Sequence, residues 1–476
     1  MNTKAKMVFR NLYYTVGANF ITLAISVLLN LFVPKLLGVR EYSYWQLYVF
    51  YSSYVGFLHL GWIDGIYLKI GGEEYENLDK DNLGSQFWYL CLFETLLSVG
   101  VIIFSQFFMP PSYKKMILTL TAVVSVITIM KTFILYVLQS TNRIKEYAQL
   151  SRGDRYLYVI MIGMYFFIGG RNFFWLIILD IISKLIITLW GMMQISDMVW
   201  QRNILKFKSV LREIVDNINI GSKLMLSSIA GMLIIGSIRF FVEQRWTIEI
   251  FGKLSFTLSI SNMFLTFINA IGIVMFPLLR RSNKEKLPWL FKTIRDLFVP
   301  ITYSFLIFYV PARYILSMWL PEYADSLQYM GILFPIVIYE GRMSLLINTY
   351  LKTIRKEKTI LFVNLLTLSL TLLFAIVIIF LVGNIMLAVG LILFSLALRC
   401  NLAEFFLCKY LDVKVGSKII LETVLTILFI IGNIVFDGGF LSMVVYLISF
   451  LVYIFIIRKN LVKSAKEFWH LMKADN

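Results

Sequence analysis

Apolar runs of about 20 residues, separated by short polar loops, follow one another along the whole of this sequence. A helix needs about 20 predominantly apolar residues to cross the hydrocarbon core of a bilayer. Runs of suitable length lie at 11–33, 45–67, 87–109, 116–138, 156–170, 173–195, 219–241, 254–276, 297–316, 326–349, 359–382, 385–408, 419–436 and 440–457. These runs predict an all-α polytopic membrane protein with about 14 transmembrane helices.

The composition supports the same class of protein. Hydrophobic residues make up 59% of the 476 residues and charged residues 15%, whereas soluble proteins are about one quarter charged. The net charge of +17 is spread over the short loops, so no nucleic acid is expected as a partner. Cys91, Cys400 and Cys408 lie within apolar runs, which is typical of small buried side chains rather than of disulfides or metal ligands.

The Lys and Arg residues of the loops are unevenly divided between the two sides of the membrane. When successive loops are assigned to alternate sides, the side with the amino terminus collects 31 of these residues and the other side collects 8. Cytoplasmic loops characteristically carry the excess of Lys and Arg. We therefore predict a multi-pass protein of the cytoplasmic membrane with both termini in the cytoplasm.

The longest central loop suggests how the chain is divided. We expect an N-lobe of six helices at 1–195, a cytoplasmic connector at 196–217, a C-lobe of six helices at 218–408, and a terminal helix pair with a cytoplasmic tail at 409–476. The connector mixes basic residues with apolar ones such as Trp200, which is typical of a segment that lies in the membrane interface. Two further stretches share this pattern, 280–296 and 458–476.

The sequence contains no motif of an enzyme or of a metal site. It has no GxxxxGK[ST] phosphate-binding loop, and its two histidines, His59 and His470, are too far apart for an HExxH zinc site. Asp79-Lys80-Asp81 matches the D-x-D of metal-dependent sugar transferases, but it lies in a short acidic loop, and we interpret it as solvated. We therefore expect no cofactor, no metal and no enzymatic activity.

Ionisable residues inside the expected spans point to a polar interior. Each charge at mid-bilayer costs roughly 2.5–3.5 kcal/mol on insertion scales. Deep cations outnumber the deep acids, which are Glu94, Asp180 and Glu340, so we predict a water-filled cationic cavity that binds phosphate oxygens. The cations assigned to this cavity are Arg239, Arg342, Lys131, Lys184 and Arg399.

Other charges in the spans have simpler interpretations. Those that lie near the expected cytoplasmic boundaries can reach the interface; they are Asp64, Lys223, Glu404 and Glu422. Asp180 and Lys184 are four residues apart on one helix, so they can pair with each other and serve only structure. The candidates for a carboxyl that responds to a coupling proton or sodium ion are Glu340, Asp180 and Asp64.

The stretch from Leu37 to Lys69 resembles a signature of polysaccharide transporters. Leu37-Gly38, Glu41-Tyr42, Gly61 and Asp64-Gly65 stand where that family has an LG…EYG turn and a charged, glycine-bearing helix end. The sequence Trp319-Leu320-Pro321-Glu322-Tyr323-Ala324 is similar to a second turn of the family. The expected six, six and two helices also resemble the multidrug, oligosaccharidyl-lipid and polysaccharide (MOP) flippase superfamily over nearly the full length.

This resemblance implies a flippase that rocks two lobes about a central cavity. Its implied substrate is an undecaprenyl-diphosphate-linked oligosaccharide, moved with its lipid tail among the membrane lipids from the inner to the outer leaflet of a bacterial cytoplasmic membrane. A lipid II flippase is the nearest alternative, although spans 11–33, 45–67 and 254–276 lack the arginines associated with that branch. A multidrug extruder would favour an acidic cavity, and a membrane glycosyltransferase or polymerase would need a large outer loop.

Overall fold

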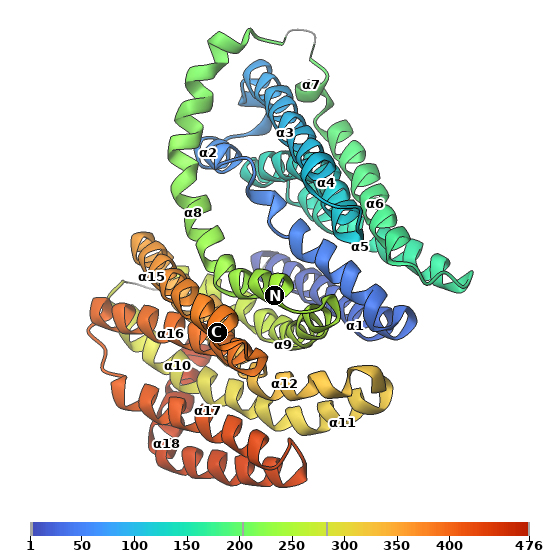
Figure 1. Cartoon of the computed structure of the whole chain (residues 1–476). Helices are drawn as coiled ribbons and strands as arrows, with labels where there is room; N and C mark the ends of the chain where they lie inside the picture. Colours follow the sequence, from blue (N-terminus) through green and yellow to red (C-terminus); the bar gives the residue numbers. More distant parts are fainter. Residues whose placement is uncertain (1–2, 202–203, 282–283, 475–476) are drawn as a thin grey trace. The chain divides into compact units, whose positions relative to one another are not determined.

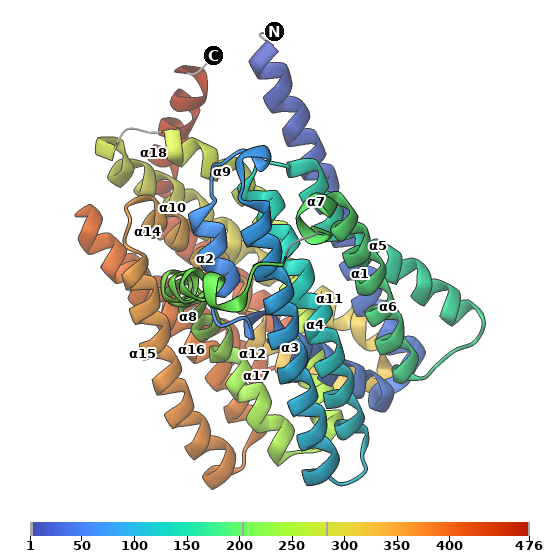
Figure 2. The same cartoon turned by 90° about the horizontal axis from the view of Figure 1, so that it is seen from above.

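The computed structural model describes the backbone of residues 3–201, 204–281 and 284–474, and the side chains of residues 24–201, 204–265 and 285–467. All regular structure in these residues is helical (Figure 1, Figure 2). The helices are α1 (Thr3–Ser52), α2 (Trp62–Lys69), α3 (Lys80–Phe108), α4 (Tyr113–Ser140), α5 (Ile144–Phe167), α6 (Phe173–Gln194), α7 (Ser196–Val199), α8 (Phe207–Arg245), α9 (Ile248–Arg281), α10 (Leu287–Ser304), α11 (Tyr309–Trp319), α12 (Leu327–Leu333), α13 (Ile336–Gly341), α14 (Asn348–Thr353), α15 (Glu357–Ile376), α16 (Ile385–Leu411), α17 (Gly416–Val435) and α18 (Phe440–Ala474). Two π-helical turns extend them, η6 (Arg342–Ile347) and η7 (Val377–Val382).

The helices are those of a multi-pass membrane protein. Within the described part of the chain, nine helices are long and apolar enough to cross a membrane, and a bent pair brings the number to ten. This confirms an all-α polytopic protein, while the total of about 14 spans stays a prediction. Polar residues in the loops set several helix starts, because their side chains accept hydrogen bonds from free backbone N–H groups. These residues are Asp79 before α3, Ser112 before α4, Asn172 before α6 and Asn384 before α16.

The second expected span, 45–67, is wrong as a continuous helix. The first and second runs share α1, which consists of two helices joined by a kink at Gly38, where φ is 74° and ψ is 173°. The helix then ends at Ser52, and the chain passes through Leu60 and Gly61, both with positive φ, before α2 begins. A left-handed residue cannot continue a right-handed helix, so the second run is divided into two helical pieces.

Close packing against α8 explains the glycines at the start of α2. A Cβ added at Gly65 would lie 1.9 Å from the carbonyl oxygen of Asn217, and one at Gly61 would lie 2.5 Å from the backbone nitrogen of Ser222. On α8, a Cβ at Gly221 would lie 2.0 Å from the Gly61 oxygen. Glycines on both helices therefore allow the two backbones to touch. This contact gives a structural reason for Gly61 and Gly65 in the stretch that resembles polysaccharide transporters.

The tenth expected span, 326–349, is likewise broken. Residues Pro321–Leu333 and Ile336–Thr353 form two arms, and the second arm is bent by 48° from the direction of the first. Pro335 lies at the bend, where it removes a backbone donor from the helix. The second arm contains the π-helical turn η6, which begins at Arg342. Turns of this kind often occur where a side chain is given an unusual position.

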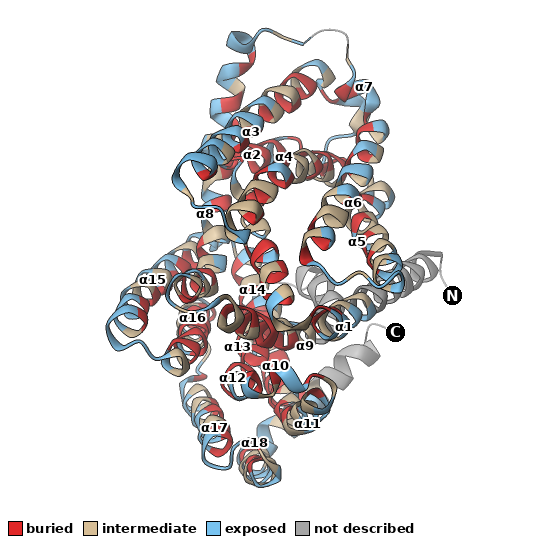
Figure 3. Cartoon of the chain, turned by 45° about the vertical axis from the view of Figure 1, so that its right-hand side comes forward, coloured by how far each residue is buried: buried red, intermediate tan, exposed pale blue. Residues whose placement is uncertain are grey.

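The chain forms two compact units, one of residues 36–229 and one of residues 1–35 with 230–476. The larger unit has an apolar core centred on α9, α12, α13 and α16, and Figure 3 shows its buried residues gathered on α12 and α13. The smaller unit has a separate core on α2, α3 and α4. The borders of the units lie within α1 and α8, so the expected lobes at 1–195 and 218–408 stay predictions.

The part of α1 that belongs to the larger unit contacts Trp319 at the end of α11. The Trp319 indole N–H donates to the carbonyl oxygen of Leu31 at 2.9 Å. The Lys35 ammonium lies 3.2 Å from the centre of the same ring, and Phe32 meets the ring edge-on. This cation–π contact gives a structural role to the tryptophan of the second family-like turn.

In the smaller unit, the connector is fastened to the start of α3. Trp88 donates to the carbonyl oxygen of Val199 at 2.8 Å, and Tyr89 donates to that of Leu205 at 2.8 Å. On α7, Asp197 accepts hydrogen bonds from Tyr75 at 2.6 Å and Lys80 at 2.7 Å. Partial burial works to raise the pKa of Asp197, but these two hydrogen bonds outweigh it, so the pKa lies below its ordinary value of 3.8.

Candidate functional site

One polar cluster lies among α1, α4, α5 and α6 of the smaller unit. Tyr48 on α1 donates a hydrogen bond of 2.6 Å to Oδ2 of Asp180, and Lys184 pairs with the same oxygen. The expected pairing of Asp180 with Lys184 along α6 is confirmed. Lys184 keeps 21% of its side chain exposed, so the ammonium can still be approached by solvent or an anion.

The same cluster contains a second ion pair that the sequence did not reveal. Lys131 on α4 lies 2.7 Å from Oδ1 of Asp154 on α5, and both side chains are about 10% exposed. Lys131 is also close enough to Lys184 and Arg155 to interact with them electrostatically. Asp154 was missed because it precedes the expected span at 156–170. The signal was the spacing of the buried residues along α5, which are Leu150, Asp154, Tyr158 and Ile162.

A larger ion cluster is completely buried inside the other unit. Arg295 pairs with Glu404 through its Nε and with Glu422 through Nη1 at 2.9 Å. Arg342 Nη1 lies 2.9 Å from Glu404 and 3.1 Å from Glu422. These four side chains are at most 2% exposed, and their formal charges cancel.

This arrangement corrects three predictions. Glu404 and Glu422 do not reach the interface, and Arg295 does not lie on an interfacial surface, because all three side chains are buried among α10, α16 and α17. Arg342 is 1% exposed and is held by two carboxylates, so its described position does not line a water-filled cavity. The sequence placed these charges near helix ends, whereas the fold brings them together in the interior.

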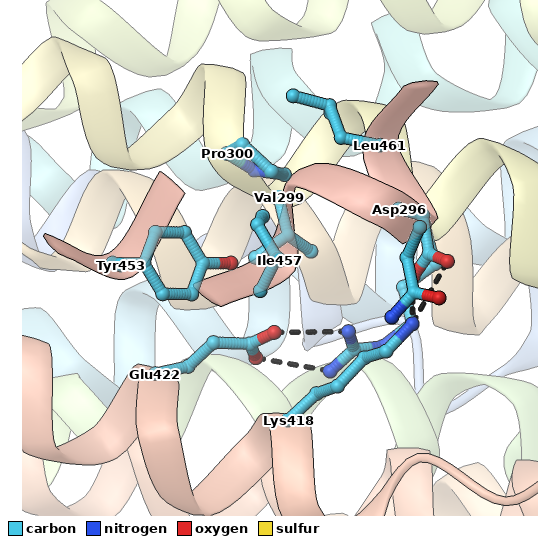
Figure 4. A pocket seen from close by; sticks show the side chains of 10 residues that line it. Asp296, Val299, Pro300, Lys418, Glu422, Tyr453, Ile457 and Leu461 are labelled. Atoms are coloured by element: carbon cyan, nitrogen blue, oxygen red, sulfur yellow. Dashed lines mark hydrogen bonds and ion pairs between the residues drawn. The ribbon is translucent and has the colours of Figure 1, made fainter. Parts of the chain in front are cut away.

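A small pocket with a cavity volume of about 10 Å³ adjoins the buried cluster (Figure 4). Lys418 bridges both carboxylate oxygens of Asp296 at 2.6 and 2.8 Å beside it. Figure 4 shows Glu422 reaching the neighbouring guanidinium from α17, while Tyr453 closes the pocket from α18. The charged side chains of this pocket are already paired, Arg295 with Glu422 and Asp296 with Lys418, so its geometry favours a structural role.

The remaining predicted cations lie elsewhere in the larger unit. Arg399 on α16 pairs with Glu340 at 2.9 Å and donates through Nε to Asn364 at 3.0 Å. The side chain of Arg399 is 11% exposed and that of Glu340 is 23% exposed. Arg239 on α8 donates to Ser255 at 2.9 Å and lies against the ring of Phe251.

The predicted excess of deep cations is therefore wrong. Lys131, Lys184, Arg342 and Arg399 each have at least one carboxylate partner among the described residues. The excess came from counting acids in the expected spans, which left out Asp154 and set aside Glu404 and Glu422 as interfacial. A low-dielectric interior favours such pairing because an isolated charge there is costly.

Asp64 on α2 is separate from these clusters. Its carboxylate lies 3.8 Å from Nε2 of His59, and its side chain is 10% exposed. His59 Nδ1 accepts a hydrogen bond from the Gly61 N–H, so a neutral imidazole carries its proton on Nε2, facing Asp64. Among the described residues, no three His, Cys, Asp or Glu side chains lie together in an arrangement that could hold a metal ion.

Two groups can still take part in binding an anion. The first is the Tyr48, Asp180 and Lys184 cluster with Lys131, and the second is Arg399 with Glu340 and Asn364. Both combine a partly exposed cation with a carboxylate from a neighbouring position. A phosphate could replace that carboxylate as the partner of the cation, because both groups present oxygens in similar geometry.

No family model matches the sequence, and no curated protein matches it. Among solved structures, an inward-facing multidrug resistance MATE family transporter of the MOP superfamily gives a TM-score of 0.58 at 12% identity, covering 81% of this chain and 94% of that chain. Lipid II flippase MurJ, in an inward closed conformation, gives a TM-score of 0.56 at 11% identity, covering 96% of this chain and 100% of that chain. A MOP superfamily transporter from Pyrococcus furiosus gives a TM-score of 0.52 at 11% identity, covering 84% of this chain and 95% of that chain. The chain therefore has the fold of MOP superfamily transporters.

Proposed function

We propose that the protein is a flippase that carries an anionic lipid-linked oligosaccharide from the inner to the outer leaflet of a bacterial cytoplasmic membrane. The observation that supports this most is the likeness to a lipid II flippase over 96% of this chain and 100% of that chain. A fold that surrounds a lipid-linked substrate in one protein can do so in another, although fold alone does not set the substrate. The substrate class therefore rests on the polar groups inside the helices.

The chemistry of those groups suits a diphosphate. Lys184 and Arg399 lie within helices, stay partly exposed, and are each held by one carboxylate. Arginine offers a planar fork of donors and lysine a compact charge, and both are usual partners of phosphate oxygens. A diphosphate entering either group would displace the carboxylate from its cation. The cation is then paired with the carboxylate when the site is empty and with the diphosphate when the site is occupied. It is therefore never left unpaired in the interior.

An undecaprenyl-diphosphate-linked repeat unit is our first choice of cargo, because the Leu37–Lys69 and Trp319–Ala324 stretches resemble polysaccharide transporters. Lipid II is the second candidate, favoured by the extent of the structural likeness. Both lipids carry a diphosphate and a sugar, so they would use the same cations. We further propose that the protein transports without catalysing a reaction, since its sequence carries no enzyme motif.

Translocation in reconstituted vesicles tests this proposal. The probe is a fluorescent undecaprenyl-diphosphate oligosaccharide, and a membrane-impermeant quencher measures how fast the probe appears in the outer leaflet. Loss of a hydrogen bond to a charged group costs about 1.5–3 kcal/mol, so Lys184→Ala and Arg399→Ala should each slow movement on the order of tenfold or more. Lys145→Ala, an exposed cation near the start of α5, is the matched control and should leave the rate unchanged.

The same vesicles separate the alternatives. Fluorescent lipid II moving faster than the oligosaccharide probe would make the second candidate the cargo. Failure of wild-type protein to move either lipid, in vesicles where the protein is folded, would overturn the proposal. Equal rates for Lys184→Ala, Arg399→Ala and wild type would remove both cations from binding while leaving the transport function in place.

A further inference from the structure

Glu94 is a buried carboxyl whose two oxygens have no hydrogen-bond partner. It lies in the middle of α3 and is 0% exposed. Neither Oε1 nor Oε2 meets a donor. Four other buried carboxylates among the described residues face a Lys or Arg at close range: Asp154, Asp296, Glu404 and Glu422. Glu94 therefore needs a different explanation from the structural ion pairs.

The surroundings of Glu94 are a contact between two antiparallel helices. α3 and α4 run side by side in the smaller unit (Figure 2). Along α3, Glu94 lies between Cys91, whose Sγ is 3.7 Å from the sulfur of Met130, and Ser98, whose hydroxyl donates to the carbonyl oxygen of Ala122 at 2.6 Å. The carboxyl is thus enclosed by helix surfaces rather than by solvent.

The ionisable groups on the helices around Glu94 leave it uncompensated. Cys91 on α3 is near enough to interact with it electrostatically. Lys131 on α4 is engaged by Asp154, and Asp197 on α7 is engaged by Lys80 at the far end of α3. Among the described residues, Glu94 has no ion-pair or hydrogen-bond partner of its own. An ionised carboxylate without a partner is very costly in such a place, and a carboxyl so placed takes up a proton instead.

The two directions along α3 differ in polarity. From Glu94 toward the end at Phe108, the contact with α4 carries small hydroxyl groups: Ser98, Ser125, and the pair Ser105 and Thr119, whose oxygens lie 3.2 Å apart. Toward the start of α3, the contact is a tight apolar core formed by Phe87, Leu90, Ile129 and Phe133, each at most 1% exposed. Hydroxyl groups can relay a proton with the help of water, whereas a packed apolar core cannot.

We propose that Glu94 is a proton-binding site of this protein, reached along the hydroxyl-lined contact of α3 and α4 and closed on the other side by the apolar core. The loop charge bias assigns the hydroxyl-lined end to the outer face of the membrane. This inference deepens the proposed function, on which it rests, by naming the coupling ion as a proton that enters from outside.

This assignment also separates Glu94 from two of the three carboxyls expected from the sequence to respond to a coupling ion, Asp180 and Glu340. Asp180 is held by Lys184 and Tyr48, and Glu340 is held by Arg399. Both carboxylates therefore already have a cation as partner, and neither is left uncompensated. Glu94 has no such partner, and its charge must change if its helix contact opens to water.

The test compares Glu94→Gln with Glu76→Gln, which changes an exposed carboxyl in a loop of the same unit. The amide has the shape of a protonated carboxyl, so Glu94→Gln should fold, and Glu94→Met is prepared in parallel as an apolar side chain of similar length. Two quantities are measured. One is the infrared band of a protonated carboxyl at neutral pH in the purified protein, and the other is the rate of lipid-linked oligosaccharide movement with and without an acidic outer buffer.

We expect the protonated-carboxyl band in wild type and Glu76→Gln and its loss in both Glu94 variants, together with loss of at least half of the stimulation by external acid. A wild-type band that persists in Glu94→Gln, or stimulation that is unchanged there, would overturn the proposal. If wild-type protein carries the band but moves no oligosaccharide probe, the proposed cargo is wrong and proton binding at Glu94 stands.

Discussion

Replacing Arg342 by alanine should unfold the protein more easily rather than only weaken binding. Arg342 Nη1 lies 2.9 Å from Glu404 and 3.1 Å from Glu422, and its side chain is 1% exposed. Without it, two buried carboxylates face the single guanidinium of Arg295. The interior then carries one uncompensated negative charge.

The size of the effect follows from that charge. Removing one partner of a buried ion pair costs about 3–5 kcal/mol, which is roughly a 150- to 4,000-fold change in the ratio of folded to unfolded protein. A second substitution can restore the balance. The double variant Arg342→Ala with Glu404→Gln removes one positive and one negative charge, leaving Arg295 paired with Glu422 through two hydrogen bonds of 2.9 Å. We expect it to recover at least half of the lost free energy of unfolding.

Thermal unfolding of the purified protein in detergent, with the amount of protein in the membrane measured separately, provides the assay. Arg342→Ala should unfold at lower temperature and accumulate poorly, and Glu404→Gln alone should do the same. The reasoning fails if Arg342→Ala is as stable as wild type but has lost transport, since that result would return Arg342 to substrate binding. It also fails if the effects of the two substitutions simply add in the double variant.

Three further predictions concern packing, the connector and topology. A Cβ at Gly65 would meet the backbone of α8 at 1.9 Å, so Gly65→Ala should lower the free energy of unfolding by about 1–3 kcal/mol. The control is Gly100→Ala, which should not lower it because nothing lies within 4 Å of an added Cβ there. Equal unfolding temperatures of the two variants would refute the close approach of α2 and α8. The pKa of Asp197 is lowered, so its hydrogen bonds stabilise the fold above about pH 3.8 and are lost as the pH falls further. Asp197→Asn should therefore speed hydrogen exchange in residues 196–201, relative to wild type at the same pH, by the same factor at pH 8 and at pH 5. A different factor at the two pH values would contradict this. A cysteine replacing Glu322 should react with an external impermeant reagent and one replacing Lys284 should not, because of the loop charge bias; the reverse pattern would overturn the orientation.

The positions of most helices could be predicted because the bilayer imposes a length on apolar runs. The runs 87–109, 116–138, 173–195 and 385–408 each lie almost wholly within one helix. The run 45–67 was predicted wrongly because apolar content does not report backbone conformation, and Leu60 with Gly61 ends the helix. Gly61 and Pro335 were visible in the sequence as possible breaks, but their effect depends on the helix against which each packs.

The polar interior could be predicted only where it is local. The pairing of Asp180 with Lys184 follows from helical spacing, since residues four apart face the same side. The pairing of Arg295 with Glu404 joins residues 109 positions apart, and nothing in the sequence specifies that α10 and α16 bring them together. Counting charges without partners therefore overstated the positive charge of the interior.

The contact between Trp319 and the first helix bears on the order in which the protein can assemble. The indole of Trp319 binds the backbone of Leu31, 288 residues earlier in the chain, so an interval of synthesis separates the two partners of this contact. At usual rates of synthesis, this interval lasts roughly 15 to 60 s. Residues 36–229 are contiguous and can pack as soon as they are inserted. The contact between Leu31 and Trp319 is therefore made late, and a truncation before Trp319 would remove it.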